Sequence, residues 1–174
     1  MKAVLISIRP EWCAKIANGE KAIEVRKTRP KRETPFKCYI YCTLPRYPHE
    51  DFIEADYPKP QFYGGGKVIG EFVCDWIYQY SSADHLYGVD ISHEDMARQS
   101  CLTRKQIEAY ELKNAPEEGY GYLGVFGWHI SGLKVYDKPR ELDSFTGLRD
   151  TRFGAAPYDI KRAPQSWCYV EEQQ

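Results

Sequence analysis

The chain has 174 residues, of which 43% are hydrophobic and 28% charged, a composition typical of a globular protein large enough to bury a core. A formal net charge of -1 gives no global electrostatic reason to expect nucleic acid or a membrane as partner, so such a case must rest on local charge. The length predicts a single domain over 1–174.

The cysteines and the first residues of the chain indicate the cellular compartment of the protein. Six Cys occur without a Cys-x-x-Cys pair, and the four His do not flank them at zinc-site spacing. We therefore expect free thiols, no metal and no cofactor. The apolar run in "MKAVLISIRP" is too short for a signal peptide, and no run is long enough to span a bilayer. These features predict a cytoplasmic protein without a membrane partner.

The chain opens with a predicted strand, helix and strand. Ala3–Ile8 alternates as a strand. The following "RPEWCAKIANG" is typical of a short helix, because Pro10 suits its first turn and Gly19 suits a left-handed cap at its end. Gly19 then leads directly into "KAIEVRK", a second strand, so Lys21 and Glu24 lie at or just beyond a helix-to-strand corner.

The middle of the chain alternates strands with long irregular segments. After a loop over Lys27–Pro35, Phe36–Thr43 is predicted as a strand. Residues 44–66 carry several prolines and end in glycines, which indicates a loop insertion. Lys67–Tyr80 is a long strand, in which Gly70 indicates a bulge or the close approach of another backbone.

The second half begins with a helical insertion over 81–115, in which Ser92 and Thr103 are suitable N-caps. Two strands, or one bent strand, surround Ser131–Gly132. Asp143–Pro164 reads as loop, and Gln165–Val170 as a last strand. About six strands with an early helix and a later helical insertion predict an α+β domain built on a small mixed β-barrel.

Glu71 lies in an apolar strand. In "VIGEFVC" it shares a face with Ile69 and Val73 in strict alternation, while the other face is also apolar. A carboxylate there must be paired, be neutral or line a cavity. A buried salt bridge is one interpretation, and a functional cavity is the other.

The corner charges allow the same two interpretations. Ile23 and Val25 bury one face of their strand, which leaves Glu24 and Arg26 together on the other. On an outer surface they would form a solvated pair of little energy. Facing a cleft, Lys21, Glu24 and Glu71 would form a compact acid–base group.

One stretch resembles a known family. "SIRPEWCAKIANGEKAIEVRKTRP" is similar to the first strand, helix and G-x-K-x-x-E-x-R signature of ASCH domains, and the resemblance continues in "YIYCT", "GKVIGEFVC" and "APQSWCYV". It does not extend to the two insertions. The resemblance implies a PUA-like β-barrel with an early helix between its first two strands, and a role in binding or modifying RNA.

Within that group are small bacterial enzymes that hydrolyse the acetyl amide of acetylcytidine with a Lys, a Thr and a Glu. The resemblance places Lys21 and Glu71 on the Lys and Glu positions, whereas the Thr position carries Glu24. A carboxylate in place of a hydroxyl favours general-base work or ion pairing over nucleophilic attack. This departure weakens the amidase interpretation.

The loop after the signature is basic. Arg26–Lys37 contains six basic residues and one acidic residue, which favours a polyanion, although a solvated loop is the alternative. Aromatic side chains could stack on a base or pack in the core. The residues expected to contact nucleic acid are Arg9, Arg26, Lys27, Arg29, Lys31, Arg32, Trp128 and Trp167.

The function favoured by the sequence is binding of RNA, or of a nucleoside or nucleotide ligand, in a charged cleft. The alternative is a hydrolase acting on an acylated nucleoside or on RNA, with catalytic residues Lys21, Glu24 and Glu71. A regulatory protein with a vestigial cleft is a third interpretation. Both site hypotheses require Lys21 and Glu71 to lie roughly 3–6 Å apart.

Overall fold

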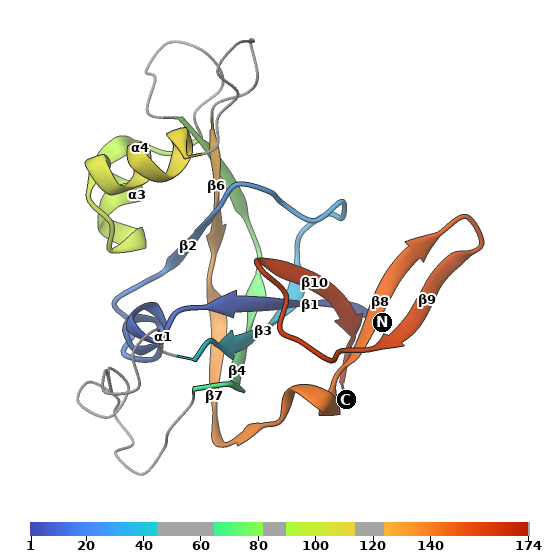
Figure 1. Ribbon diagram of the computed structural model, residues 1–174. Helices are drawn as coiled ribbons and strands as arrows, with labels where there is room; N and C mark the ends of the chain where they lie inside the picture. Colours follow the sequence, from blue (N-terminus) through green and yellow to red (C-terminus); the bar gives the residue numbers. More distant parts are fainter. Residues whose placement is uncertain (45–64, 82–89, 114–123, 174) are drawn as a thin grey trace.

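The computed structural model describes residues 1–44, 65–81, 90–113 and 124–173. These residues form two β-sheets with helices beside them, as Figure 1 shows. The strands are β1 (Lys2–Ile8), β2 (Ile23–Arg26), β3 (Phe36–Cys42), β4 (Lys67–Cys74), β5 (Ile77–Tyr80), β6 (Val125–His129), β7 (Ser131–Arg140), β8 (Thr146–Thr151), β9 (Gly154–Asp159) and β10 (Trp167–Glu171). The helices are α1 (Pro10–Ala17), α3 (His93–Ser100), α4 (Arg104–Leu112) and the short 3-10 helix η1 (Leu142–Ser144).

The larger sheet has seven strands in the order β7-β4-β3-β1-β10-β8-β9, and the smaller has the order β2-β6-β5. The α+β class and the early helix between the first two strands are confirmed. The predicted closed barrel is wrong, because the large sheet is open, with β7 and β9 at its edges. Only Ile130 separates β6 from β7, so the chain leaves one sheet and enters the other within a single residue.

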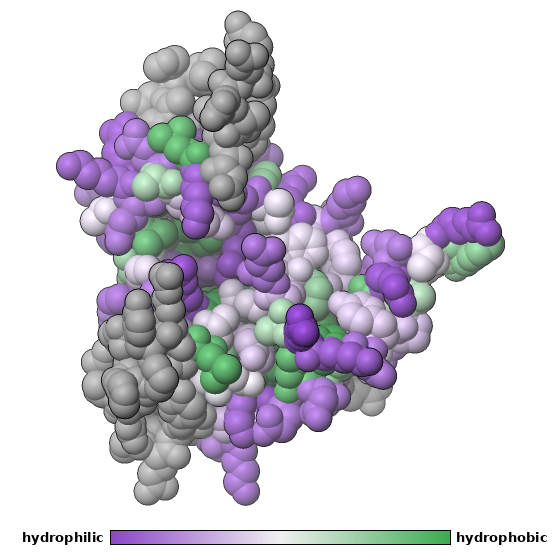
Figure 2. Space-filling model, in the orientation of Figure 1, coloured by the Kyte–Doolittle hydropathy of each residue, from purple (hydrophilic) through white to green (hydrophobic). Residues whose placement is uncertain are grey.

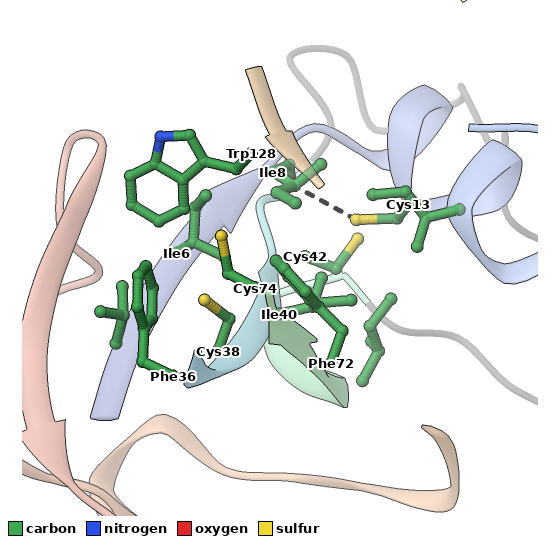
Figure 3. Packing of buried hydrophobic residues seen from close by; sticks show 13 residues of the cluster. Ile6, Ile8, Cys13, Phe36, Cys38, Ile40, Cys42, Phe72, Cys74 and Trp128 are labelled. Atoms are coloured by element: carbon green, nitrogen blue, oxygen red, sulfur yellow. Dashed lines mark hydrogen bonds between the residues drawn. The ribbon is translucent and has the colours of Figure 1, made fainter. Parts of the chain in front are cut away.

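Helix α1 forms where the sequence predicts it. Pro10 occupies the first turn, and Gly19 has a φ of 76°, a conformation that glycine adopts without strain. The helix buries Cys13 and Ile16 in the core cluster shown in Figure 3, which also holds Val4, Ile6 and Ile8 of β1. This packing fixes the end of β1 and the start of β2 on one side of the molecule.

Strand β4 contains the irregularity expected at Gly70. The register with β7 shifts between Val68 and Gly70, and a Cβ on Gly70 would lie 2.5 Å from the carbonyl oxygen of Lys134. A side chain there would clash with backbone, so only glycine fits. The bulge also changes which face the following side chains occupy.

The helical insertion packs against the smaller sheet. Ser92 accepts a hydrogen bond from the backbone N–H of Asp95 at the start of α3, and Thr103 forms a capping box at the start of α4. Met96 and Ile107 are fully buried against β2 and β6. Of the predicted insertion over 81–115, residues 82–89 and 114–115 lie outside the described residues, as do residues 45–64 of the predicted loop insertion.

None of the described helices is both long and apolar enough to cross a membrane.

Candidate functional site

A cavity of about 650 Å³ opens between α1, β2 and α4. Its floor is the start of β2, and its walls come from the end of β1, the first turn of α1 and one side of α4. In Figure 2, hydrophilic side chains predominate over α3 and α4, beside the cavity. The lining residues that matter below are Arg9, Trp12, Lys21, Glu24, Arg26, Leu102, Gln106, Tyr110, Lys113 and Gln165.

The floor is a buried ion cluster centred on Glu24. One carboxylate oxygen lies 3.0 Å from Nη2 of Arg26, and the other lies 3.4 Å from Nζ of Lys21. The side chain of Lys21 is 2% exposed and that of Glu24 is 8% exposed. The signature spacing therefore places two cations on one carboxylate, largely out of solvent, so these charges are not a solvated surface pair.

Local strand geometry explains this arrangement. Ile23 and Val25 pack with α3 and α4, so the alternate residues Glu24 and Arg26 face the other way. Glu24 is directly opposite Trp128 in the β2–β6 pair and thus faces the same side as that core residue. The strand thereby brings a carboxylate to the junction of the two sheets.

Backbone carbonyls hold the two cations. Nζ of Lys21 donates to the carbonyl oxygen of Ser100 at 2.7 Å, and Nη2 of Arg26 donates to that of Ser7 at 2.6 Å. Lys21 thus ties the end of α3 to the corner, and Arg26 ties β2 to the end of β1. These contacts stiffen the cavity floor.

Two buried polar atoms of the cluster lack hydrogen bonds. Within the described part of the chain, Oε2 of Glu24 accepts none and Nε of Arg26 donates none. Buried polar atoms without a hydrogen bond are uncommon in native proteins, although Oε2 keeps its ion pair with Lys21 at 3.4 Å. They mark the floor as a place where a small movement could offer an acceptor and a donor to a bound group.

The rim is basic and aromatic. Arg9 has a side chain that is 76% exposed, and Lys113 is also exposed. Two rings line the cavity, each with an ammonium group near its face: Nζ of Lys21 lies 5.2 Å from the ring centre of Trp12, and Nζ of Lys27 lies 5.4 Å from that of Tyr110. Such cation–π contacts hold the rings in place.

Glu71 is not part of this cavity, and its predicted pairing with Lys21 is wrong. It pairs across the sheet with Tyr39, which belongs to the core cluster on the face opposite Ile6 and Ile40. Its carboxylate accepts a hydrogen bond from the hydroxyl of Tyr136 at 2.6 Å and lies 3.7 Å from Nζ of Lys37.

The bulge at Gly70 explains the error. Strict alternation puts Ile69 and Glu71 on one face, whereas the structure places Ile69 and Phe72 in one cluster and turns Glu71 to the other. Burial, together with the Glu71 carboxylate, raises the pKa of Tyr136 well above its ordinary value. Of the two interpretations of Glu71, a paired charge and a cavity residue, the structure agrees with the paired charge.

The basic loop after β2 is fixed at several points. The indole N–H of Trp167 donates to the hydroxyl of Thr28 at 3.0 Å, and the hydroxyl of Tyr169 accepts from the backbone N–H of Lys31 at 2.9 Å. The guanidinium of Arg32 donates to the carbonyl oxygen of Lys2. Trp167 is half-buried, and its hydrogen bond to Thr28 holds this loop in place.

The remaining candidate residues divide between exposed and enclosed positions. Arg29 and Lys31 are exposed on the loop, whereas Lys27 donates to the carbonyl oxygens of Glu111 and Lys113 at the end of α4. Trp128 is fully buried, 5.9 Å from Phe36 in an edge-on contact. The predicted stacking of a base on Trp128 is therefore wrong, because its ring has no exposed face.

Sequence reasoning missed Trp12, Gln106, Tyr110 and Lys113 as cavity residues. The last three lie within the helical insertion, to which the family signature does not extend. Their spacing of three to four residues is a one-sided helical pattern, but only the position of α4 over β2 shows which side faces a cavity.

Comparison with known proteins identifies the fold. No protein-family model matches the sequence, and no curated protein matches it significantly. The structure of ASCH from Zymomonas mobilis is similar with a TM-score of 0.52 and 17% sequence identity, covering 98% of this chain and 88% of that chain. A tyrosine-to-phenylalanine variant of the Zymomonas mobilis protein matches with a TM-score of 0.54 and 15% identity, covering 99% and 92%.

The chain thus has the fold of an ASCH domain, and the fold implied by the signature is confirmed except for barrel closure. At this level of identity the likeness concerns the fold alone. The function must be argued from the cavity.

Proposed function

We propose that the cavity binds a nucleotide, either free or as one unit of an RNA strand. The observation that carries this proposal is a single cavity lined by four basic residues, one carboxylate and two aromatic rings. The basic residues are Arg9, Lys21, Arg26 and Lys113. Such a set matches the three parts of a nucleotide: a phosphate, a planar base and polar base edges.

Each part of a nucleotide has a group in the cavity that could bind it. The excess of basic groups favours a phosphate, and the exposed side chains of Arg9 and Lys113 at the rim can reach one. The rings of Trp12 and Tyr110 offer flat surfaces for a base, a contact worth about 1–3 kcal/mol. The volume of about 650 Å³ is suitable for a small ligand.

The exposed part of the basic loop supports the RNA form of the ligand. Arg29 and Lys31 are exposed beyond the end of β2, whose residues form the cavity floor. A strand with one nucleotide in the cavity could run its phosphates past them. The six free cysteines accord with a reducing compartment, and we accordingly propose a cytoplasmic location.

The hydrolase alternative now rests on Lys21 and Glu24, which meet at the cavity floor. Glu24 would be the general base and Lys21 the electrostatic stabiliser, acting on an acylated nucleoside or on RNA. Glu71, outside the cavity, has no position from which to reach the same substrate.

Equilibrium binding of a fluorescent single-stranded RNA of about ten nucleotides tests the proposal. The double variant Arg9→Gln with Lys113→Gln removes two rim charges, and we expect it to weaken binding about tenfold or more. The matched control, Lys105→Gln with Lys138→Gln, removes two exposed charges outside the cavity lining and is expected to change affinity much less. Equal losses in the two variants, or no binding of RNA or nucleotides by the wild type, would refute the proposal.

Turnover separates the binder from the hydrolase. Wild-type protein is incubated with acetylcytidine and with RNA, and the products are measured by mass spectrometry. A hydrolase based on Glu24 would lose about 10²–10⁴ of its rate in Glu24→Gln and little in Glu71→Gln. If the wild type turns over neither substrate, the hydrolase alternative is excluded and binding is the remaining function.

A further inference from the structure

The free edge of β2 borders the cavity. Within the described sheets, β2 is an edge strand that pairs only with β6. The cavity lining takes Glu24 and Arg26 from one face of this strand and Tyr110 from α4, which packs over the other face. A space lined from both faces of a strand must lie at one of its edges. Since β6 occupies the paired edge and, although described in full, contributes no lining residue, the cavity lies at the free edge.

The pairing with β6 directs the main chain of Val25 toward this edge. In an antiparallel pair of strands, residue pairs that exchange two hydrogen bonds alternate with pairs that exchange none. The backbone N–H of Ile130 donates to the carbonyl oxygen of Ala22 at 2.9 Å, so Glu24, two residues on, also bonds to β6. Val25 lies opposite Gly127 in a pair without hydrogen bonds. Its N–H and C=O groups therefore point away from β6.

These two groups are enclosed but have no partner in the described part of the chain. Val25 lines the cavity and is only 6% exposed, and neither its N–H nor its C=O bonds to another described residue. Buried backbone groups are almost always paired, so water or a ligand in the cavity must complete them. A donor and an acceptor side by side fit a ligand edge that carries an acceptor next to a donor.

We propose that the main chain of Val25 binds the base of the nucleotide by its Watson–Crick edge. This inference rests on the proposed nucleotide function and names the part of the ligand that is bound. In uracil, the ring N3–H donates to the carbonyl oxygen of Val25, and the neighbouring O4 accepts from its N–H; guanine offers N1–H and O6 in the same way. Cytosine and adenine each offer an amino group beside a ring nitrogen. All four bases can therefore bind, whereas a base with a blocked edge cannot.

The two aromatic rings of the cavity lie on opposite sides of this edge. Trp12 packs with the core cluster that holds Trp128, and Glu24 faces the same side. Tyr110 packs with the cluster that holds Val25. A base bonded to the main chain of Val25 continues the plane of the sheet, so one of its faces is turned to the side of Trp12 and the other to that of Tyr110. Stacking and edge binding thus use different parts of the base.

Substituting Val25 leaves its carbonyl in place, so the first test changes the ligand. Equilibrium binding is measured for UMP, N3-methyl-UMP and C5-methyl-UMP. A methyl group on N3 removes the donor and blocks the edge, whereas the matched methyl group on C5 adds the same bulk away from it. We expect N3-methyl-UMP to bind about tenfold or more weakly than UMP, and C5-methyl-UMP to stay within about threefold. GMP and N1-methyl-GMP repeat the comparison for a purine.

Amide NMR locates the contact. The N–H of Ile23 is the matched control, because it also points away from β6 but Ile23 does not line the cavity. Saturation with UMP should move the Val25 amide proton downfield and leave that of Ile23 nearly unchanged. Equal binding of the edge-blocked and unmodified nucleotides, or shifts in the cavity that spare Val25, would overturn the inference while leaving nucleotide binding intact. Failure of UMP, CMP, GMP and AMP alike to bind would remove the proposed function and the inference together.

Discussion

Glu24 is the residue on which the cavity floor depends. Among the described residues that line the cavity, its carboxylate is the only acidic group, and it lies between Lys21 and Arg26, both largely enclosed. Removing one partner of a buried ion pair leaves the others without a counter-charge, which costs more than the pair itself contributes.

Glu24→Gln should therefore lower the free energy of unfolding by about 3–5 kcal/mol in urea denaturation. Glu71→Gln is the control, because its side chain is 20% exposed and the amide oxygen can still accept from Tyr136. For that variant we expect a loss below about 1 kcal/mol. Similar losses in the two variants would mean that Glu24 is no more critical to folding than the partly exposed Glu71.

The residues of the cavity floor could be predicted from the sequence, but the side chains that surround Glu71 could not. The spacing of Glu24 and Arg26 follows strand periodicity, which holds in β2, whereas Lys21 lies at the corner before the strand. A single bulge at Gly70 reverses the periodicity in β4, and although the glycine indicated the bulge, its effect on the following side chains depends on how β4 and β7 pair.

At the scale of elements, Lys21 connects the core fold to the helical insertion. Its Nζ donates to the carbonyl of Ser100 at the end of α3, and the backbone N–H of Ala22 donates to that of Gln99 at 2.8 Å. The charge-assisted bond from Lys21 is expected to contribute about 1.5–3 kcal/mol, so its removal should loosen α3 and α4 locally.

Lys21→Met is therefore expected to speed amide hydrogen exchange in α3 and α4 by about tenfold or more, with little change in β1 and β3. Exchange is measured by mass spectrometry of peptides from the native protein. The control, Lys105→Met, removes an exposed lysine of α4 and should leave exchange unchanged. Faster exchange spread evenly over both sheets would show a global rather than a local effect.

Elements with strong apolar periodicity were predictable, whereas the β8–β9 hairpin was not. β1, β3 and α1 bury regular stripes of side chains. The segment assigned to a loop over 143–164 contains β8 and β9, in which most side chains are half-buried or exposed. Backbone pairing rather than burial defines this hairpin, so its sequence carries little hydrophobic pattern.

At the scale of the whole molecule, an almost neutral chain exposes positive charge on the loop that follows β2. Arg29 and Lys31 are exposed on this loop, while Arg32 is tied to the backbone of Lys2. The two exposed residues are thus the ones whose side chains can reach phosphates without loosening the loop.

Neutralising Arg29 and Lys31 together should flatten the salt dependence of RNA affinity. Each phosphate of a single strand that the protein no longer neutralises reduces the slope of log affinity against log salt by about 0.7, so two such phosphates should change it by about 1.4. Affinity is measured across a salt series for the wild type, the Arg29→Gln, Lys31→Gln variant and the Lys105→Gln, Lys138→Gln control. An unchanged slope would show that the loop does not contact the RNA backbone.

The most direct test of the central claim, that this cavity binds a nucleotide, is an NMR map of the contact. UMP or a short single-stranded RNA is added to isotope-labelled protein, and the backbone and side-chain amide shifts are followed. We predict saturable shifts at the indole N–H of Trp12, the side-chain amide of Gln106 and the backbone of β2. The account would be contradicted if no residue shifted, or if the shifts gathered elsewhere, such as around the exposed Phe153 at the tip of the β8–β9 hairpin.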